Sequence, residues 1–173
     1  MKLNISDEIL AEIGKIVITH NLIESSLSNI IGTIISLRTH EEIGQIVTAE
    51  LSFRQKIPML RSLLVLCLTD KHESVAEFDK IKGKLHEADS QRNIIVHSNW
   101  FKSEEHEHEI VIRSKTTAKE KHGLRCDSVE MNLQEIEAIS DLIADAYLKI
   151  CMFELQFQHS KEEPEPVGTG QPM

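Results

Sequence analysis

Apolar residues recur every three or four positions through the first part of the chain. This spacing places one stripe of side chains on one face of a helix, so it predicts a long first helix. Ser6, followed by two acidic residues, predicts where that helix begins, because its hydroxyl can accept a hydrogen bond from a free amide of the first turn. One polar residue interrupts the stripe, which consists of Ile9, Ile13, Ile16, His20, Ile23, Leu27, Ile30 and Ile34.

Four pairs of residues have the spacing of a capping box, in which two side chains three positions apart bond each other's backbone amides. They predict helix starts near residues 39, 52, 70 and 132. Pro58 falls inside the helix that the second pair predicts, and because proline lacks a backbone N–H we expect a kink or a delayed start there. The pairs are Thr39 with Glu42, Ser52 with Gln55, Asp70 with Glu73, and Asn132 with Glu135.

The two later helices carry contrasting apolar faces. The fourth helix should span about residues 73–97, with an arginine among the apolar residues of its buried face. The helix after residue 132 has a regular heptad pattern, which can face the core of one chain or join two protomers, and we favour the core. The faces are Phe78, Ile81, Leu85, Ala88, Arg92 and Ile95 in the fourth helix, and Ile136, Ile139, Ile143, Ala146, Ile150, Phe153 and Phe157 in the last.

Between these helices the pattern changes to alternating charged and apolar residues. Ile110 and Ile112 lie in such a segment, and residues 124–131 could pair back on it, which predicts a β-hairpin over about residues 108–131. From residue 160 onward, acidic residues, prolines and glycines without periodicity predict a disordered acidic and proline-rich tail, residues 160–173. We therefore expect an all-α fold, an up-and-down helical bundle of about five helices over residues 1–159, with the small hairpin inserted before the last helix.

Length and charge narrow the functional classes. The chain has 173 residues, the size of one domain. Acidic residues outnumber basic ones by 28 to 19, so the net charge of −9 repels polyanions and any contact with nucleic acid must depend on local cations. An aromatic content of 4% argues against a protein that coats RNA by base stacking. The three cysteines lack the pair spacing of zinc or redox motifs.

The N-terminus lacks the basic-then-apolar order of a signal peptide. The longest apolar stretch, residues 16–37, is interrupted by polar residues that would be costly inside a bilayer. We therefore expect a cytoplasmic protein with no membrane contact.

The sequence Arg-Asn-Ile-Ile-Val-His near the end of the fourth predicted helix combines a cation with a titratable imidazole. An arginine on an apolar face keeps its charge and therefore needs a carboxylate, a phosphate or water. Glu24 and Asp89 are the candidate carboxylates, and an ordinary ion pair with either is the alternative to a functional site. Arg92 and His97 lie about 140° apart around a straight helix. His97 instead shares a strip with Asn93 and Asp89.

These residues resemble the ribonuclease motif of the HEPN superfamily: an arginine followed by a polar residue, with a histidine five positions after the arginine, late in a small helical domain. A long first helix carrying polar residues and a hydrophobic central helix add to the resemblance, which covers residues 6–157. It implies a HEPN-like helical domain over residues 1–159. The resemblance to active members implies that in this chain Arg92 would stabilise phosphoryl oxygens, Asn93 would orient the histidine or the phosphate, and His97 would transfer protons.

The resemblance also implies how such a protein works. It points to a metal-independent endoribonuclease that needs no cofactor and acts as a homodimer, with the two motifs facing each other across a composite site. RNA or a nucleotide would be the ligand, and the protein could be a toxin or defence effector with an antitoxin or other protein partner.

Three interpretations remain open at this point. The first is the nuclease, with Glu24, Asp89 and His20 as supporting residues. The second is a non-catalytic helical dimer that binds a nucleotide or a protein. The third is a structural adaptor, which predicts that Arg92 pairs with Glu24 or Asp89 in its own chain and that His97 is away from any cleft.

Two histidine features have plainer alternatives. His20 could approach the motif from the first helix, although a hydrogen-bonded core histidine is the favoured interpretation. His106 and His108 would point to one side of a strand as two metal ligands do, but a third ligand is missing, so we expect no metal site.

Overall fold

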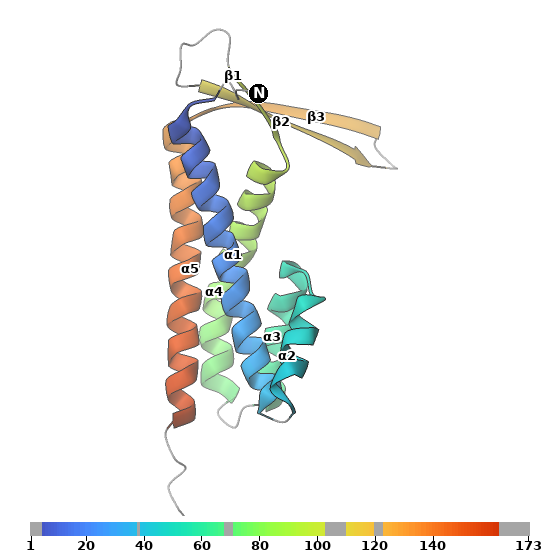
Figure 1. Cartoon of the computed structure of the whole chain (residues 1–173), viewed down its shortest axis with the longest axis vertical. Coiled ribbons are helices and arrows are strands. Elements are labelled where there is room, and N and C mark those ends of the chain that lie inside the picture. The colour runs from blue at the N-terminus through green and yellow to red at the C-terminus, as the bar shows by residue number, and fades with distance from the viewer. Residues whose placement is uncertain (1–4, 38, 68–70, 103–109, 120–122, 163–173) are drawn as a thin grey trace, which may run out of the picture.

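The computed structural model describes residues 5–37, 39–67, 71–102, 110–119 and 123–162 (Figure 1). Five helices and a small antiparallel sheet form this part of the chain, which confirms the helical class. In chain order the elements are α1 (Asp7–Ser36), α2 (Glu41–Ala49), α3 (Phe53–Cys67), α4 (Lys71–Val96), β1 (Asn99–Lys102), β2 (Ile110–Lys119), β3 (Gly123–Asn132) and α5 (Leu133–Glu162).

Helix α1 is the centre of the arrangement and contacts each of the other four helices. It lies side by side with α5, while the sheet covers the end of the molecule where α1 begins and α4 ends (Figure 1). Two ion pairs show that α3 and α4 run in opposite directions, because Arg54 pairs with Asp89 and the later Arg61 pairs with the earlier Asp79. The end of α4 is thereby held between α1, α3 and the sheet.

The apolar stripes predicted from the sequence form the core. In α1 the whole stripe is buried except for the partly buried Ile13, and His20 is buried with it. The heptad face of α5 is also buried in this chain, with Ile139 partly exposed, so it packs in the core and is not free to join protomers. In α4 the apolar members of the predicted face pack inward, and Arg92 is half-buried among them.

Helix starts follow the predicted caps in three places. The Ser6 hydroxyl accepts a hydrogen bond from the Ile9 amide. The Gln55 side chain accepts one from the Ser52 amide, immediately before α3. At α5 the capping box is complete: Asn132 and Glu135 each accept a hydrogen bond from the other's backbone amide, at 2.9 Å in both cases.

One predicted cap and the predicted delay of one helix start were wrong. Thr39 does not cap α2, because its hydroxyl donates to the Ile35 carbonyl oxygen and His40 takes the cap position without a side-chain bond. Helix α3 begins at Phe53 and continues through Pro58, so the proline does not delay its start. Its position in the second turn needs the loss of only one helical hydrogen bond. The pair Asp70 with Glu73 begins outside the described residues, and α4 starts at Lys71.

The sheet is larger than the predicted hairpin. Strands β2 and β3 pair over ten residues each, from Ile110 opposite Asn132 to Lys119 opposite Gly123. Gly123 has a positive φ of 68°, a conformation that other residues adopt at a cost. The sequence interpretation missed β1, whose four residues pair with the outer edge of β2. His106 and His108 lie outside the described residues.

The end of α5 also differs from the prediction. The helix extends to Glu162, beyond the predicted start of the tail at residue 160. The rest of the tail, residues 163–173, lies outside the described residues. Among the residues that the structure describes, no helix combines the length and apolar character needed to cross a membrane.

Candidate functional site

Asp89 is the centre of a polar cluster buried between α4, α1 and α3. Its side chain is 4% exposed. One carboxylate oxygen accepts a hydrogen bond from Arg54 Nε at 2.7 Å, and the other accepts one from Asn93 Nδ2 at 3.0 Å. His20 Nε2 lies 3.6 Å from this second oxygen, too far for a hydrogen bond. The carboxylate is therefore satisfied by α3 and by its own helix.

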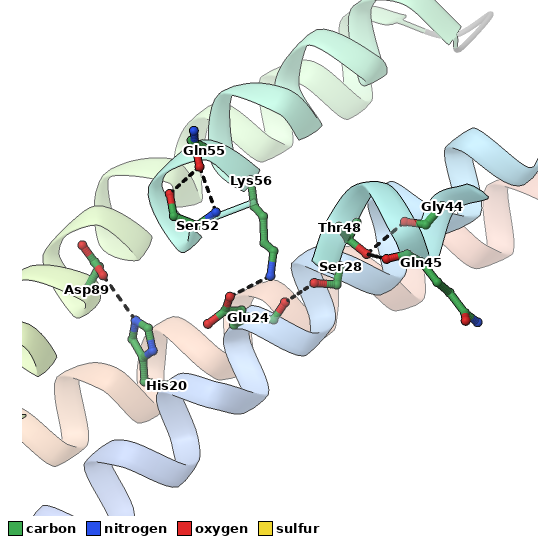
Figure 2. A network of polar contacts seen from close by, with 10 residues as sticks. All are labelled: His20, Glu24, Ser28, Gly44, Gln45, Thr48, Ser52, Gln55, Lys56 and Asp89. Carbon is green, nitrogen blue, oxygen red and sulfur yellow. Dashed lines mark hydrogen bonds and ion pairs between the residues drawn. The ribbon is translucent and has the colours of Figure 1, made fainter. Parts of the chain in front are cut away.

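Glu24 is held by a different cation. Lys56 Nζ of α3 donates to Glu24 Oε1 at 2.7 Å, and the lysine side chain is 7% exposed (Figure 2). A buried ammonium is costly without a counter-ion, so this pair supplies what Lys56 requires. Both carboxylates that the sequence offered to Arg92 are thus paired with residues of α3.

Arg92 has no carboxylate partner in the described part of the chain. Its Nη1 donates to Asn93 Oδ1 at 3.0 Å, and its buried Nε has no acceptor among the described residues. The guanidinium has five N–H donors and keeps its charge at any physiological pH. Because the side chain is half-buried, solvent reaches only part of this group. The structural-adaptor interpretation predicted an ion pair of Arg92 with Glu24 or Asp89, and the described residues show neither pair.

His20 is a core histidine without hydrogen bonds. It is 2% exposed, and its ring packs against Phe53 with centroids 4.5 Å apart. Neither ring nitrogen has a hydrogen-bond partner in the described structure. Burial lowers the pKa of this imidazole from its ordinary value, and the Arg92 guanidinium lowers the pKa further, against the opposite influence of nearby carboxylates. The ring is therefore neutral at pH 7.

His97 lies apart from this cluster. It follows the last residue of α4 and is exposed, and its backbone amide donates to the Asn93 carbonyl oxygen at 3.3 Å. Its side chain has no hydrogen bond or ion pair within the described ranges. One chain thus brings together Arg92, Asn93, Asp89 and His20, while the Glu24–Lys56 pair lies one helical turn further along α1.

The sheet supplies the groups that bind the end of α4. The last turn of this helix has no basic residue of its own. Lys115 Nζ of β2 donates to the Asn93 carbonyl oxygen at 3.4 Å, and Trp100 Nε1 of β1 donates to that of Ile95 at 3.1 Å. Arg113 Nη1 donates to Ser98 Oγ at 3.3 Å. Two cations of β2 therefore lie beside the motif, at the negative end of the helix dipole.

Sequence reasoning missed the residues that come from other elements. Arg54 and Lys56 belong to α3, and only their folded positions show that they pair with Asp89 and Glu24. A partial signal was available, since a buried carboxylate requires a cation from somewhere in the chain. Nothing in the local pattern of β2 indicated that Lys115 reaches α4.

A polar groove lies beside the Glu24–Lys56 pair, between α1, α2 and α5. Its volume is about 980 Å³, and Lys56 lies at its wall. Figure 2 shows this lysine between Glu24 and the hydroxyl-bearing turn of α2. Helices α1 and α2 approach each other closely here. A Cβ atom added to Gly44 would lie only 2.7 Å from Gly32 Cα. Hydroxyl and amide side chains line the groove, among them Ser28, Asn29, Thr33, Gln45 and Thr48.

No family model, curated protein or solved structure matches this chain.

Proposed function

We propose that this chain is a HEPN-like, metal-independent endoribonuclease that acts as a homodimer. The observation that supports it most is the state of Arg92, a half-buried guanidinium with no carboxylate partner among the described residues. Both candidate carboxylates are held by other cations. An arginine in this state has donors available for an external anion, and a phosphodiester fits its fork geometry.

The residue types suit transfer at phosphorus. The 2′-oxygen of the substrate attacks the phosphorus and loses its proton, the bond to the 5′-oxygen breaks, and that oxygen gains a proton. His97 can accept the first proton or supply the second, since it is exposed and an imidazole can act as a general base or, once protonated, as a general acid. Arg92 stabilises the charge that develops on the phosphoryl oxygens.

Asn93 has a narrower role in this proposal than the motif alone implied. Its side-chain oxygen accepts from Arg92, and its side-chain nitrogen donates to Asp89. The amide therefore links the arginine to a buried, fixed carboxylate and orients the guanidinium. Asp89 holds the Asn93 amide by a hydrogen bond, and Arg54 in turn holds Asp89. Within the described residues the Asn93 side chain forms no hydrogen bond with the His97 side chain, so no such contact supports the interpretation in which Asn93 orients the histidine.

A homodimer accounts for the separation of Arg92 from His97. About 140° of helix rotation divides the two residues, so the motif of a second copy is needed to bring arginine and histidine to one phosphate from both sides. Cleavage of cellular RNA by such a dimer fits a toxin or a defence effector, held in check by an antitoxin protein.

The alternative is a non-catalytic module that binds a nucleotide. The groove of about 980 Å³ beside Lys56 favours this reading, because its hydroxyl and amide lining can bond a sugar and a base. In that case ligand contacts lie on α1 and α2, and Arg92 would not be needed for binding.

The test is cleavage of a mixed RNA pool by purified protein in excess chelator. Arg92→Ala and His97→Ala should each lose activity by about 100-fold or more, as expected for removing a transition-state donor or an acid–base group. Arg61→Ala is the matched control, since it removes an arginine that pairs with Asp79 on the surface. All variants should keep the thermal midpoint of the parent within a few degrees.

Absence of cleavage by folded wild-type dimer would overturn the nuclease proposal. Nucleotide binding that survives Arg92→Ala and is lost in Thr48→Ala or Lys56→Met would then support the groove.

A further inference from the structure

Arg113 and Lys115 have donors beyond those that hold the end of α4. Lys115 uses one N–H for the Asn93 carbonyl oxygen, and Arg113 uses one for Ser98 Oγ. Ammonium carries three donors and guanidinium five. Both side chains are partly exposed, and within the described residues neither forms an ion pair. Asp127 is the register partner of Lys115, and its carboxylate is the competing anion on the sheet.

Both cations point to the face of the sheet that packs on the helices. Val111, two residues before Arg113, is buried in the core, and side chains two apart on a strand share a face. Along this face of β2 the buried Val111 is followed by Arg113 and then by Lys115. The bond from Lys115 to Asn93 places its ammonium beside the residue that orients Arg92.

We propose that Arg113 and Lys115 bind the phosphates next to the one held by Arg92, so that the site takes an extended single RNA strand. This inference rests on the proposed function. Residues two apart on a strand are about 7 Å apart. Successive phosphates of one nucleic-acid strand are a comparable distance apart, whether or not the bases are stacked. A single strand is expected because attack by the 2′-oxygen in line with the departing 5′-oxygen needs a backbone geometry that a stacked duplex does not allow.

The same cations resolve the conflict between an acidic chain and an anionic substrate. The net charge of −9 belongs to the whole molecule. Arg92, Arg113 and Lys115 are gathered at one end of α4, where the buried carboxylate of Asp89 is already paired with Arg54. Local cations within a Debye length, about 8 Å at physiological salt, decide how an anion binds there.

A purely structural role, in which the two residues only cap α4, predicts a different outcome. Such a role would change the stability of the fold without changing how binding depends on salt or on the length of RNA. Glutamine is the informative substitution, because its side-chain amide can still donate to Asn93 or Ser98 while the charge is removed.

The experiment measures binding of 2′-O-methyl RNA, which lacks the attacking hydroxyl and is not cleaved. Labelled single strands of two and ten nucleotides, and a ten-base-pair duplex, are titrated by fluorescence anisotropy between 50 and 300 mM salt. The test variant is Arg113→Gln with Lys115→Gln. The control variant is Lys80→Gln with Lys82→Gln, which removes two charges from the other half of α4.

The test variant should bind the ten-nucleotide strand about 25-fold more weakly at 0.1 M salt. Its slope of log affinity against log salt should be smaller by about 1.4, since each phosphate contact on a single strand contributes about 0.7. The control variant should match wild type in this slope. Binding of the dinucleotide should be unchanged in both, and the duplex should bind more weakly than the single strand.

An unchanged ten-nucleotide affinity and slope in the test variant would overturn the inference and leave the nuclease proposal intact. Equal losses for the two lengths would assign the residues to capping alone, and tighter binding of the duplex would rule out the extended strand. Failure of the proposed function is distinct: dinucleotide binding would then be absent, or would survive Arg92→Ala.

Discussion

The two halves of α4 carry cations in opposite states. Near the middle of the helix three lysines each form an ion pair with a carboxylate: Lys80 with Glu77, Lys82 with Asp79, and Lys84 with Asp145 of α5. These pairs are on the surface, where water screens them and each contributes little to stability. In the last two turns Arg92 is half-buried and has no such partner in the described structure.

The two regions of α4 differ in whether a carboxylate is available to pair with their cations. Near the end of α4 the buried carboxylate of Asp89 is taken by Arg54 from α3, while Arg113 and Lys115 of β2 bring further positive charge. The excess of cations arises where three elements meet. The comparison shows that a protein with a strong negative net charge can still gather several cations in one place.

Giving Arg92 a carboxylate partner should remove the difference between the two regions of α4. Asn93→Asp replaces the oxygen that Arg92 binds at 3.0 Å with a charged one of the same shape. RNA cleavage should fall by about 100-fold, because the arginine becomes paired and a phosphate meets a negative charge. Asn93→Ala, which removes only the orienting amide, should cost about tenfold, as expected from the loss of one hydrogen bond of roughly 1.4 kcal/mol. Steady-state cleavage rates in chelator measure both, and equal effects would contradict a free Arg92.

Asp89 and Asp79, two carboxylates of α4, should differ in how much they contribute to the free energy of unfolding. Asp89→Asn should lower the free energy of unfolding by about 1–3 kcal/mol, because a buried acceptor of two hydrogen bonds is replaced by a group that must donate. Asp79→Asn should change it little, since that carboxylate is on the surface and binds Arg61 in water. Urea unfolding at pH 7.5 measures both changes. A larger effect at Asp79 would mean that the cluster around Asp89 is not the structural support of the site.

The smallest expected effect concerns pH and His20. The folded protein keeps this ring neutral because burial lowers its pKa. The unfolded chain takes up a proton as pH falls below about 6.5. The free energy of unfolding should therefore decrease as pH falls from about 6.5 to 5, and His20→Leu should reduce that slope. Urea unfolding across this range is the measurement. His97→Ala, which changes an exposed histidine, serves as the control and should keep the slope; an equal reduction in both variants would place the titration elsewhere.

Most of the fold could be predicted from local patterns. The stripe in α1 and the heptad face in α5 are long, so their periodicity identified both helices and their buried faces. Strand β1 was missed because four residues carry too little alternation to be recognised, and it forms by pairing with β2. The cap of α2 was misplaced by one residue, since Thr39 bonds back to α1.

The candidate site could be predicted only in part. The arginine on the apolar face of α4 led to the polar cluster around Asp89, because a buried charge demands a partner. The identity of that partner depends on α3, whose Arg54 is 35 residues from Asp89 in the chain. Neither this pairing nor the approach of Lys115 from β2 leaves a signal in the local sequence. The separation of Arg92 from His97, in contrast, was expected from their five-residue spacing, which places them about 140° apart around a helix.

The most direct test of the central claim is to observe the Arg92 side chain while an anion binds. Arginine Nε–H resonances can be recorded by NMR during titration with a non-cleavable 2′-O-methyl dinucleotide and assigned with Arg92→Lys and Arg61→Lys. The account predicts that the Arg92 resonance shifts in a saturable manner, while that of Arg61, already bound to Asp79, does not. An Arg92 resonance that stays in place while the dinucleotide binds elsewhere would contradict the claim that this arginine is held ready for a phosphate.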